Sequence, residues 1–233
     1  MIKISTSLSD FLALFYPRYC FGCDNSLIQG EVCLCSQCLA VLPKTHFHLQ
    51  KNNPVEMLFA GRIPIFRATA FYSFHKGGIV QHLIHQLKYK GKMEIGTYLG
   101  HLFGIALMES ADFQSIDLIL PVPLHPHKKQ KRGYNQSEII CNGIVEGMKK
   151  QYDYNLLVRT VDTQTQTQKS RYNRWENVSQ IFKVIQPEIL TGKHILLVDD
   201  VVTTGATLEA AAQMLLEIPN TKVSIACLAY ANS

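Results

Sequence analysis

The stretch ILLVDDVVTTGAT, residues Ile195–Thr207, sets two adjacent carboxylates between an aliphatic run and a loop rich in threonine and glycine. Four apolar residues before Asp199 are typical of a strand buried on both faces, as in parallel sheets, and we expect the strand to end at the carboxylates. Apolar residues then recur at helical spacing, at Leu208, Ala211, Ala212, Leu215 and Leu216. The segment therefore predicts strand, loop and helix.

The loop of this segment has the properties of a phosphate site. The free N–H groups of a first helical turn, the positive end of the helix dipole and three threonine hydroxyls all favour a dianion. Gly205 lets the backbone come close to it. A phosphate alone would be repelled by Asp199 and Asp200, whereas a sugar with vicinal hydroxyls, with or without Mg²⁺, satisfies both. The stretch predicts a ribose 5-phosphate moiety.

The same stretch resembles the signature of the type I phosphoribosyltransferases. In that family the acidic pair takes the ribose hydroxyls of phosphoribosyl pyrophosphate (PRPP), with Mg²⁺, and the Thr/Gly loop takes the 5-phosphate. The alternative is a buried strand ending in a solvated turn, but two acids followed by T-T-G-x-T rarely arise by chance. The resemblance implies a PRPP site formed by Asp199, Asp200, Thr203, Thr204, Gly205, Ala206 and Thr207.

Length and composition set the broad class. With 233 residues and a formal net charge of +5, the chain suits one large domain, or a main domain with a small appendage, and a phosphorylated ligand. The charge is far below what would require a nucleic-acid partner. We expect no membrane span and no signal peptide, because no apolar run is long enough, and therefore a cytoplasmic protein.

Five of the seven cysteines lie close together near the amino terminus. Cys20 and Cys23 form one pair and Cys35 and Cys38 another, and this spacing predicts a tetrahedral Cys₄ zinc site. Disulfides are the alternative, but an odd number of clustered cysteines in a cytosolic chain argues against them. Cys33 is left over and could replace Cys35. Four thiolates close the coordination shell, so the zinc would be structural.

The chain between about Gln50 and Ile65 has weak periodicity and carries two prolines and a glycine, which favours a domain boundary there. We expect residues 1–58 to form an amino-terminal helix and zinc ribbon, and residues 59–233 a phosphoribosyltransferase-like domain. The stretch LSDFLALFYP before Cys20 predicts a short apolar helix packed on the main domain, or, as a minor alternative, resting on a membrane surface.

The remaining patterns predict an α/β fold with a mostly parallel, doubly wound sheet. Further strands are expected at Ile116–Pro121 and in NLLVRT, IFKVI and KVSIACLAY, and helices in IVQHLIHQLKYKGK and QSEIICNGIVEGM. Ligands of such sheets bind beyond the carboxyl ends of the strands. The Asp199 loop and the loop after Pro121 should therefore meet at one edge.

Four basic residues are candidates for contact with a pyrophosphate or a substrate. They are Lys88, Lys129, Arg132 and Arg174. Lys88 ends a predicted helix, where the alternative interpretation is that it only complements the helix dipole. Lys129 and Arg132 lie in the loop HPHKKQKRGYNQS, for which the alternative is a basic loop that contacts only solvent. Arg174 lies in a long polar segment from Asp162, which is typical of a lid or of disorder.

Together these stretches resemble the ComF branch of the phosphoribosyltransferase fold, which is linked to DNA uptake and competence. The matching elements after the cysteines are Leu87-Lys88-Tyr89 with Gly91, Pro121-Val122-Pro123-Leu124, Arg132-Gly133-Tyr134-Asn135-Gln136, and Arg174, Asn177, Val178 and Phe182. One departure is that an arginine usual before Arg132 is replaced by Lys128 or Lys129, which keeps the charge but loses the bidentate fork.

Three functions fit these patterns. The first is an enzyme that displaces pyrophosphate from PRPP with an unidentified acceptor, for which no general base stands out. The second is a PRPP or nucleotide sensor, or an adaptor that contacts competence-machinery proteins, without turnover. The third is a single-stranded DNA-binding protein that uses the basic loops. Fold alone does not choose among them, and the sequence predicts no oligomeric state.

Overall fold

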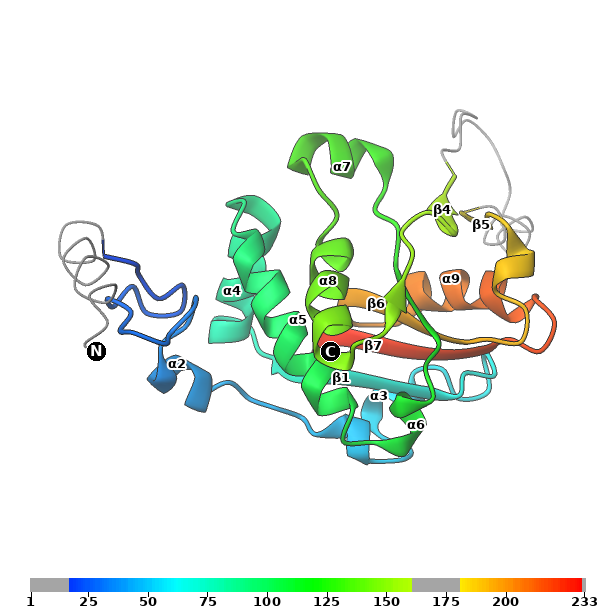
Figure 1. Cartoon of the computed structure of the whole chain (residues 1–233), viewed down its shortest axis with the longest axis horizontal. Helices are drawn as coiled ribbons and strands as arrows, with labels where there is room; N and C mark the ends of the chain where they lie inside the picture. The colour runs from blue at the N-terminus through cyan, green and yellow to red at the C-terminus, as the bar shows by residue number, and fades with distance from the viewer. Residues whose placement is uncertain (1–16, 161–180, 232–233) are drawn as a thin grey trace, which may run out of the picture.

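A sheet of five parallel strands lies at the centre of the molecule, in the order β1-β7-β6-β2-β3 (Figure 1). The structure, a computed structural model, describes residues 17–160 and 181–231. The strands are β1 (Arg67–Phe74), β2 (Leu118–Pro121), β3 (Gln151–Tyr152), β6 (His194–Val202) and β7 (Lys222–Ala231). The predicted parallel sheet is confirmed, but β6 continues past the two carboxylates to Val202 instead of ending at them.

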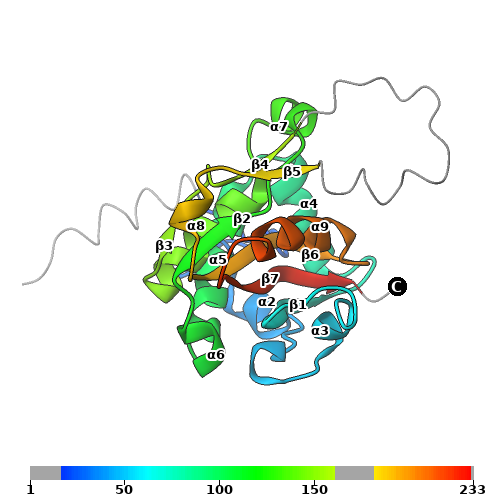
Figure 2. The ribbon, with the colours of Figure 1, turned by 90° about the vertical axis from the view of Figure 1, so that its right-hand side faces the viewer.

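Helices cover both faces of this sheet, because its central strands are apolar on both sides (Figure 2). In β6, Leu196 and Val198 join the core with α4 (Ile79–Tyr89), α5 (Met93–Leu107) and α8 (Gln136–Met148). Ile195 and Leu197 join the core with α3 (Pro54–Met57) and α9 (Ala206–Leu216) on the other face. The three predicted helices α4, α8 and α9 are therefore confirmed as parts of a doubly wound fold.

Helices α5 and α8 pack in very close contact through glycine. A Cβ on Gly147 would lie 2.5 Å from the carbonyl oxygen of His101, and one on Gly104 2.5 Å from that of Ile144. A Cβ on Gly143 would collide with the carbonyl oxygen of Thr97. Because interiors are close-packed, larger residues here would push the helices apart. The glycines thus fix the position of α8, whose first turn reaches the carboxyl edge of the sheet.

Two predicted segments differ from expectation. NLLVRT and IFKVI do form strands, β4 (Leu157–Arg159) and β5 (Phe182–Val184), but these pair with each other antiparallel in a separate hairpin. The basic stretch after β2 was expected as a loop and forms the helix α7 (Pro126–Arg132), because proline at its first position and lysine, glutamine and arginine after it favour a helix.

The remaining elements are α2 (Ser36–Ala40), η1 (Phe47–Leu49), α6 (Ala111–Gln114) and η4 (Pro187–Ile189).

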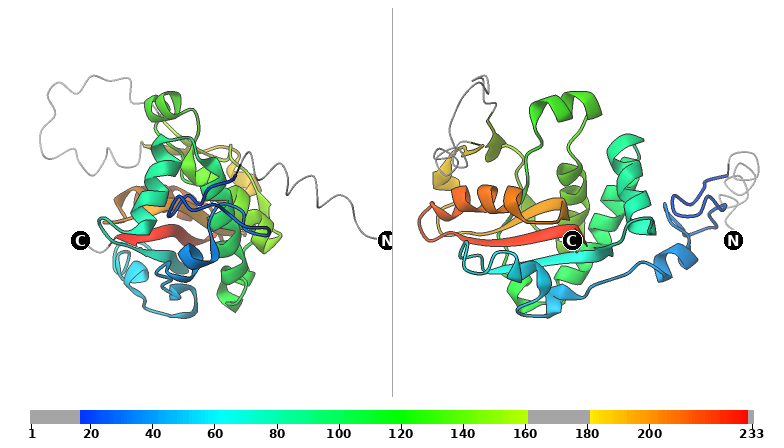
Figure 3. Two further views of the ribbon diagram at one scale, coloured as in Figure 1. Left: turned by 90° about the vertical axis from the view of Figure 1, so that its left-hand side faces the viewer. Right: turned by 180° about the vertical axis from the view of Figure 1, so that it is seen from behind.

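The cysteine-bearing segment lies against α4, on the side of the molecule away from α9 (Figure 3). The Gln86 side-chain amide donates a hydrogen bond of 2.6 Å to the Phe21 carbonyl, and the Lys92 ammonium lies 5.1 Å from the Phe21 ring centroid. The domain boundary near residue 58 stays a prediction, and the predicted helix before Cys20 lies outside the described residues except for Pro17. None of the helices in 17–160 or 181–231 has the length and apolar character needed to cross a membrane.

Candidate functional site

Two carboxylates lie at the carboxyl end of β6, at the edge where α8 and the end of α4 also arrive. The Ser137 hydroxyl donates a 2.9 Å hydrogen bond to Asp199 Oδ1, and the Asp200 N–H donates to the same oxygen at 2.8 Å. The Lys88 ammonium lies 2.8 Å from Asp200 Oδ1. Ser137 is held in turn by the Asn135 side chain, which caps α8 and donates to the Val122 carbonyl at 3.0 Å. The acidic pair is therefore fixed from three elements.

Asp199 is the carboxyl with the more unusual acidity. Burial, and then the neighbouring Asp200 carboxylate, raise its pKa to about 7. The hydrogen bonds from the Asp200 N–H and Ser137 and the charge of Lys88 act in the opposite direction. A ligand that donates hydrogen bonds to this carboxylate, or brings a cation to it, would stabilise its charged form.

The loop between β6 and α9 forms a small cavity with Asp199. Its volume is about 70 Å³, and its lining consists of Asp199 together with Val201 to Leu208. Gly205 has a φ of +78° and precedes the first turn of α9, so the loop turns sharply into the helix. The three threonines are exposed, and the cavity is the point at which the N–H groups of α9 face outward.

Two residues that sequence patterns did not indicate support this loop from behind. A Cβ on Gly205 would lie 2.9 Å from Phe59 Cε1, so the buried Phe59 ring fills the space beneath the glycine. The Arg62 guanidinium donates to the Thr204 carbonyl at 3.2 Å and to the Leu58 carbonyl at 3.0 Å, and pairs with Glu209. Both come from the segment before β1, far away in the sequence, where no local pattern could reveal them.

The basic candidates are mostly already partnered. Lys129 pairs with Glu138 at 2.9 Å on the exposed face of α7. Arg132 donates to the Gln136 side chain and lies 5.3 Å from the Tyr89 ring centroid. The structure thus brings Lys88 into contact with the acidic pair. It places Lys129 and Arg132 in α7, beside the same edge. Arg174 lies outside the described residues.

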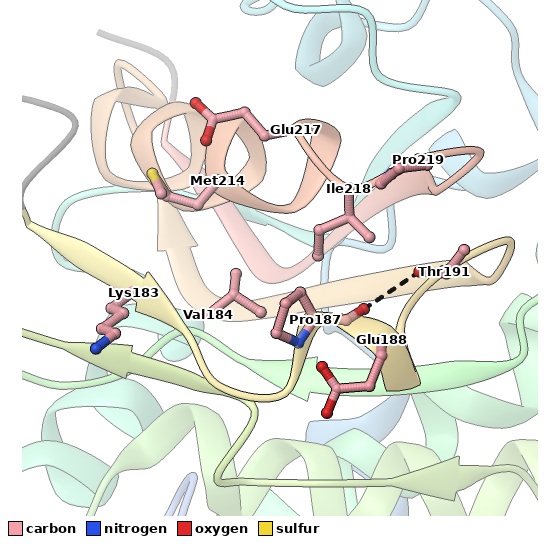
Figure 4. Close-up of a pocket in the computed structure, with 9 residues that line it drawn as sticks. All are labelled: Lys183, Val184, Pro187, Glu188, Thr191, Met214, Glu217, Ile218 and Pro219. Carbon is pink, nitrogen blue, oxygen red and sulfur yellow. Dashed lines mark hydrogen bonds between the residues drawn. The ribbon is translucent and has the colours of Figure 1, made fainter.

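A larger cavity lies elsewhere, between the β4–β5 hairpin, η4 and the carboxyl-terminal half of α9 (Figure 4). Its volume is about 500 Å³, and it is lined by Val184, Pro187, Met214, Ile218 and Pro219 with Lys183, Glu188, Thr191 and Glu217 at its sides. It shares no residue with the Asp199 cavity, and two of its three charged groups are acidic. The cation of this cavity, Lys183, lies with two carboxylates, so the net charge of the lining disfavours a phosphate.

The four paired cysteines form a compact cluster. The sulfur atoms of Cys20, Cys23, Cys35 and Cys38 all lie within 4.8 Å of one another, and those of Cys23 and Cys35 are 3.7 Å apart. Tetrahedral coordination with bonds of about 2.3 Å gives sulfur separations of about 3.8 Å, so the cluster fits such an ion. The sulfur of Cys20 also accepts N–H groups from Gly22 at 3.3 Å and Cys35 at 3.2 Å, as a thiolate would. Cys33 is buried and lies outside the cluster.

Comparisons with known proteins identify the family to which the chain is similar. The phosphoribosyl transferase domain family matches residues 154–233. DNA utilization protein YhgH of Shigella flexneri is 32% identical over 226 residues, which is 93% of this chain and 92% of the relative. Competence protein F of Haemophilus influenzae is 27% identical over 153 residues, 64% of this chain and 67% of the relative.

Among solved structures, the Bacillus subtilis glutamine PRPP amidotransferase is 21% identical, with a TM-score of 0.42 over 57% of this chain and 26% of that one. The parallel five-stranded sheet and the matched domain give the chain an α/β fold of the phosphoribosyltransferase type I class. The extent of the similarity to YhgH, together with the amino-terminal cluster of four cysteines, shows that the chain belongs to the ComF/YhgH family of phosphoribosyltransferase-domain proteins.

Proposed function

We propose that the protein binds PRPP at the carboxyl edge of the sheet and transfers its phosphoribosyl group to an acceptor. The observation that carries this proposal is that Asp199 and the Thr203–Thr207 loop line one cavity. In the proposed complex Asp199 and Asp200 take the ribose hydroxyls, directly or through Mg²⁺, while Thr203, Thr204, Gly205, Ala206 and Thr207 take the 5-phosphate.

The proposed transfer is a displacement at C1 of the ribose. The acceptor's nucleophile forms a bond to C1, the bond from C1 to the pyrophosphate oxygen breaks, and pyrophosphate leaves with the bonding electrons. Mg²⁺ would neutralise phosphate charge as it does in other phosphoryl ligands. The acidic pair favours the positive charge that builds on the ribose, and Lys129, Arg132 and Arg174 are the candidate partners of the leaving group. Lys88 is a further candidate, because its ammonium keeps N–H donors beyond the one that pairs with Asp200.

The test is calorimetric titration of PRPP, with and without Mg²⁺, followed by a pyrophosphate-release screen over nucleobases, amines and nucleotides. The proposal expects one Mg²⁺-dependent site per chain and release with one acceptor class. Saturable binding without release over the whole screen would support the sensor or adaptor alternative. Absence of PRPP binding would contradict both.

A zinc ion held by Cys20, Cys23, Cys35 and Cys38 is the second part of the proposal. Four thiolates leave no open position, so the ion would hold the segment folded and take no part in the reaction. The cytoplasm keeps such thiols reduced, and we expect the protein to act there. Elemental analysis should find one zinc per chain, and Cys35→Ser should release it. Protein with an intact amino terminus and no metal would contradict this part.

Single-stranded DNA is a further candidate ligand, because Lys128, Lys129 and Lys131 are exposed on α7. Together with the relatives' roles in competence and DNA utilization, this supports a link to DNA uptake. Replacing the three lysines with glutamine should flatten the salt dependence of DNA binding by roughly three phosphate contacts. An unchanged slope would exclude α7 as the contact.

A further inference from the structure

Helix α4 contacts both the cysteine-bearing segment and the acidic pair. Figures 1 and 3 show it between that segment and the sheet. Its last turn carries Gln86, which is bonded to the segment, and Lys88, whose ammonium lies 2.8 Å from Asp200 Oδ1. Because the two residues belong to one helical turn, a displacement of that turn moves both contacts together.

The Cys20–Cys23 turn fits closely against this helix. The buried Gln86 amide donates a 2.6 Å hydrogen bond to the Phe21 carbonyl, at the carboxyl end of α4. At the other end of the helix, a Cβ on Gly22 would lie 3.1 Å from Ile79 Cδ1, and the same Cβ would lie 2.9 Å from a sulfur of the cysteine cluster. The turn therefore contacts the cluster and both ends of α4.

Buried apolar contacts join the cysteines to the same helix. Cys20 and Leu34 belong to one hydrophobic core with Leu83 and Leu87 of α4. Since interiors are close-packed, a segment that is fixed by four thiolates on one ion restrains the helix that packs against it. The end of α4 is thus held on the side that faces the cysteine cluster.

The position of this turn matters for the acidic pair. The side chains of Lys88 and Asp200 are only 23% and 12% exposed, so solvent screens their charges weakly and their attraction depends closely on geometry. On the side of the sheet, the Tyr134 hydroxyl donates to the Leu87 carbonyl. The turn that carries Lys88 is therefore held from two sides, by the cysteine-bearing segment and by the chain that leads into α8.

We propose that Gln86 is a positioning residue, through which the Cys20–Cys23 turn keeps the Lys88 ammonium beside Asp200. This inference rests on the proposed function, because the ion and the ribose ligand both belong to it. Coupling between two binding sites is reciprocal. If the ion favours the position of Lys88 that suits the ligand, the ligand must raise the affinity of the cluster for its ion. Zinc affinity therefore reports on the coupling without any turnover.

The experiment measures the zinc affinity of the full chain by equilibrium competition with a chromogenic chelator, with and without saturating ribose 5-phosphate. The ligand should raise the zinc affinity of the wild type about fivefold or more, the lower end of typical coupling between sites. Gln86→Met keeps the length of the side chain but removes the donor, and should reduce this effect to less than about twofold. The matched control is Gln81→Met on the same helix, where the Gln81 side chain accepts from the Gly77 N–H. It should keep the full effect.

Calorimetry on the same samples shows whether ribose 5-phosphate is bound. Equal zinc affinity of the wild type with and without bound ligand would overturn the inference, and this comparison requires no variant to fold. A folded Gln86→Met variant that keeps the full effect would also overturn it. A wild type that holds zinc but does not bind ribose 5-phosphate would refute the proposed function, and this inference with it.

Discussion

Charged and polar side chains are paired within the chain at one end of the central sheet, and are paired less completely at the other. At the amino end, Arg67 is buried between the carboxylates of Glu56, 2.5 Å away, and Asp112, and donates to the Gln50 carbonyl at 2.7 Å. The buried His194 ring has a hydroxyl on each nitrogen, Ser115 and Ser224, both at 2.8 Å. Each of these polar groups is matched within the chain.

At the carboxyl end, two carboxylates adjoin each other with Lys88 as their one cationic ion-pair partner among the described residues, and the half-buried Arg159 has no ion pair there. Gly205 holds a left-handed backbone beside exposed threonines. Since unmatched charge costs stability, its concentration at this end indicates a ligand that compensates for it. The matched end stabilises the fold, and the unmatched end is the one at which we propose that the ligand binds.

The largest effect should come from breaking the matched end. Arg67→Met leaves the Glu56 and Asp112 carboxylates beside each other without a counter-charge, and should lower the free energy of unfolding by about 3 kcal/mol. Urea denaturation measures this change. Affinity for ribose 5-phosphate should be unchanged while the variant is folded. A loss of ligand binding in the folded variant would contradict the separation of a stabilising end from a binding end.

Gly205→Ala tests the backbone at the unmatched end. Alanine at a φ of +78° costs about 1 to 2 kcal/mol, and its Cβ would press on Phe59, 2.9 Å away. We expect that loss in urea denaturation, and a roughly tenfold loss of ribose 5-phosphate affinity by calorimetry. The matched control is Gly192→Ala, which has a φ of +73° and open space around its Cβ. It should lose similar stability and no affinity; equal affinities in the two variants would remove the loop from the site.

Asp199 gives the unmatched end a pH dependence. Its pKa is raised to about 7, and a ligand that donates hydrogen bonds to the carboxylate favours the charged form. Binding below pH 7 must therefore release a proton, so affinity for ribose 5-phosphate should fall up to tenfold per unit as the pH is lowered from 7. Asp199→Asn separates this effect from the titration of the phosphate itself and should have the shallower profile. Identical pH profiles of affinity for Asp199→Asn and the wild type would exclude Asp199 as the group that titrates on binding.

The smallest effect is expected at Lys129. Its ion pair with Glu138 is exposed, so Lys129→Gln should change the free energy of unfolding by no more than about 0.5 kcal/mol. Its effect on pyrophosphate affinity should also be small, because the ammonium is exposed to solvent and already has an acidic partner. A loss of about tenfold or more for Lys129→Gln in calorimetry would make α7 the principal contact of the leaving group.

The parts of the site that are contiguous in sequence could be predicted from it. Asp199 to Thr207 and the four cysteines carry their chemistry within a few residues, so strand, loop and spacing reveal them. The type of fold followed from the alternation of strands and helices, although β1 was missed and β4 and β5 were expected in the main sheet.

The supporting residues could not be predicted because their partners are distant in the chain. Phe59 and Arg62 meet the loop across more than 140 positions, as the Arg62 bond to Thr204 shows. Ser137 reaches Asp199 because glycines set the approach of α8 to α5. Tertiary contacts, rather than local pattern, decide these positions.

Titration of magnesium PRPP into Asp200→Asn tests the central claim most directly. Asparagine keeps the shape of Asp200 and removes its charge, so affinity should fall by about 1.5 to 3 kcal/mol, the range for a hydrogen bond to a charged group. Urea denaturation checks that the variant is folded, because the change also weakens the largely buried pair with Lys88. Wild-type affinity for PRPP in this folded variant would contradict the assignment of the unmatched end of the sheet as the PRPP site.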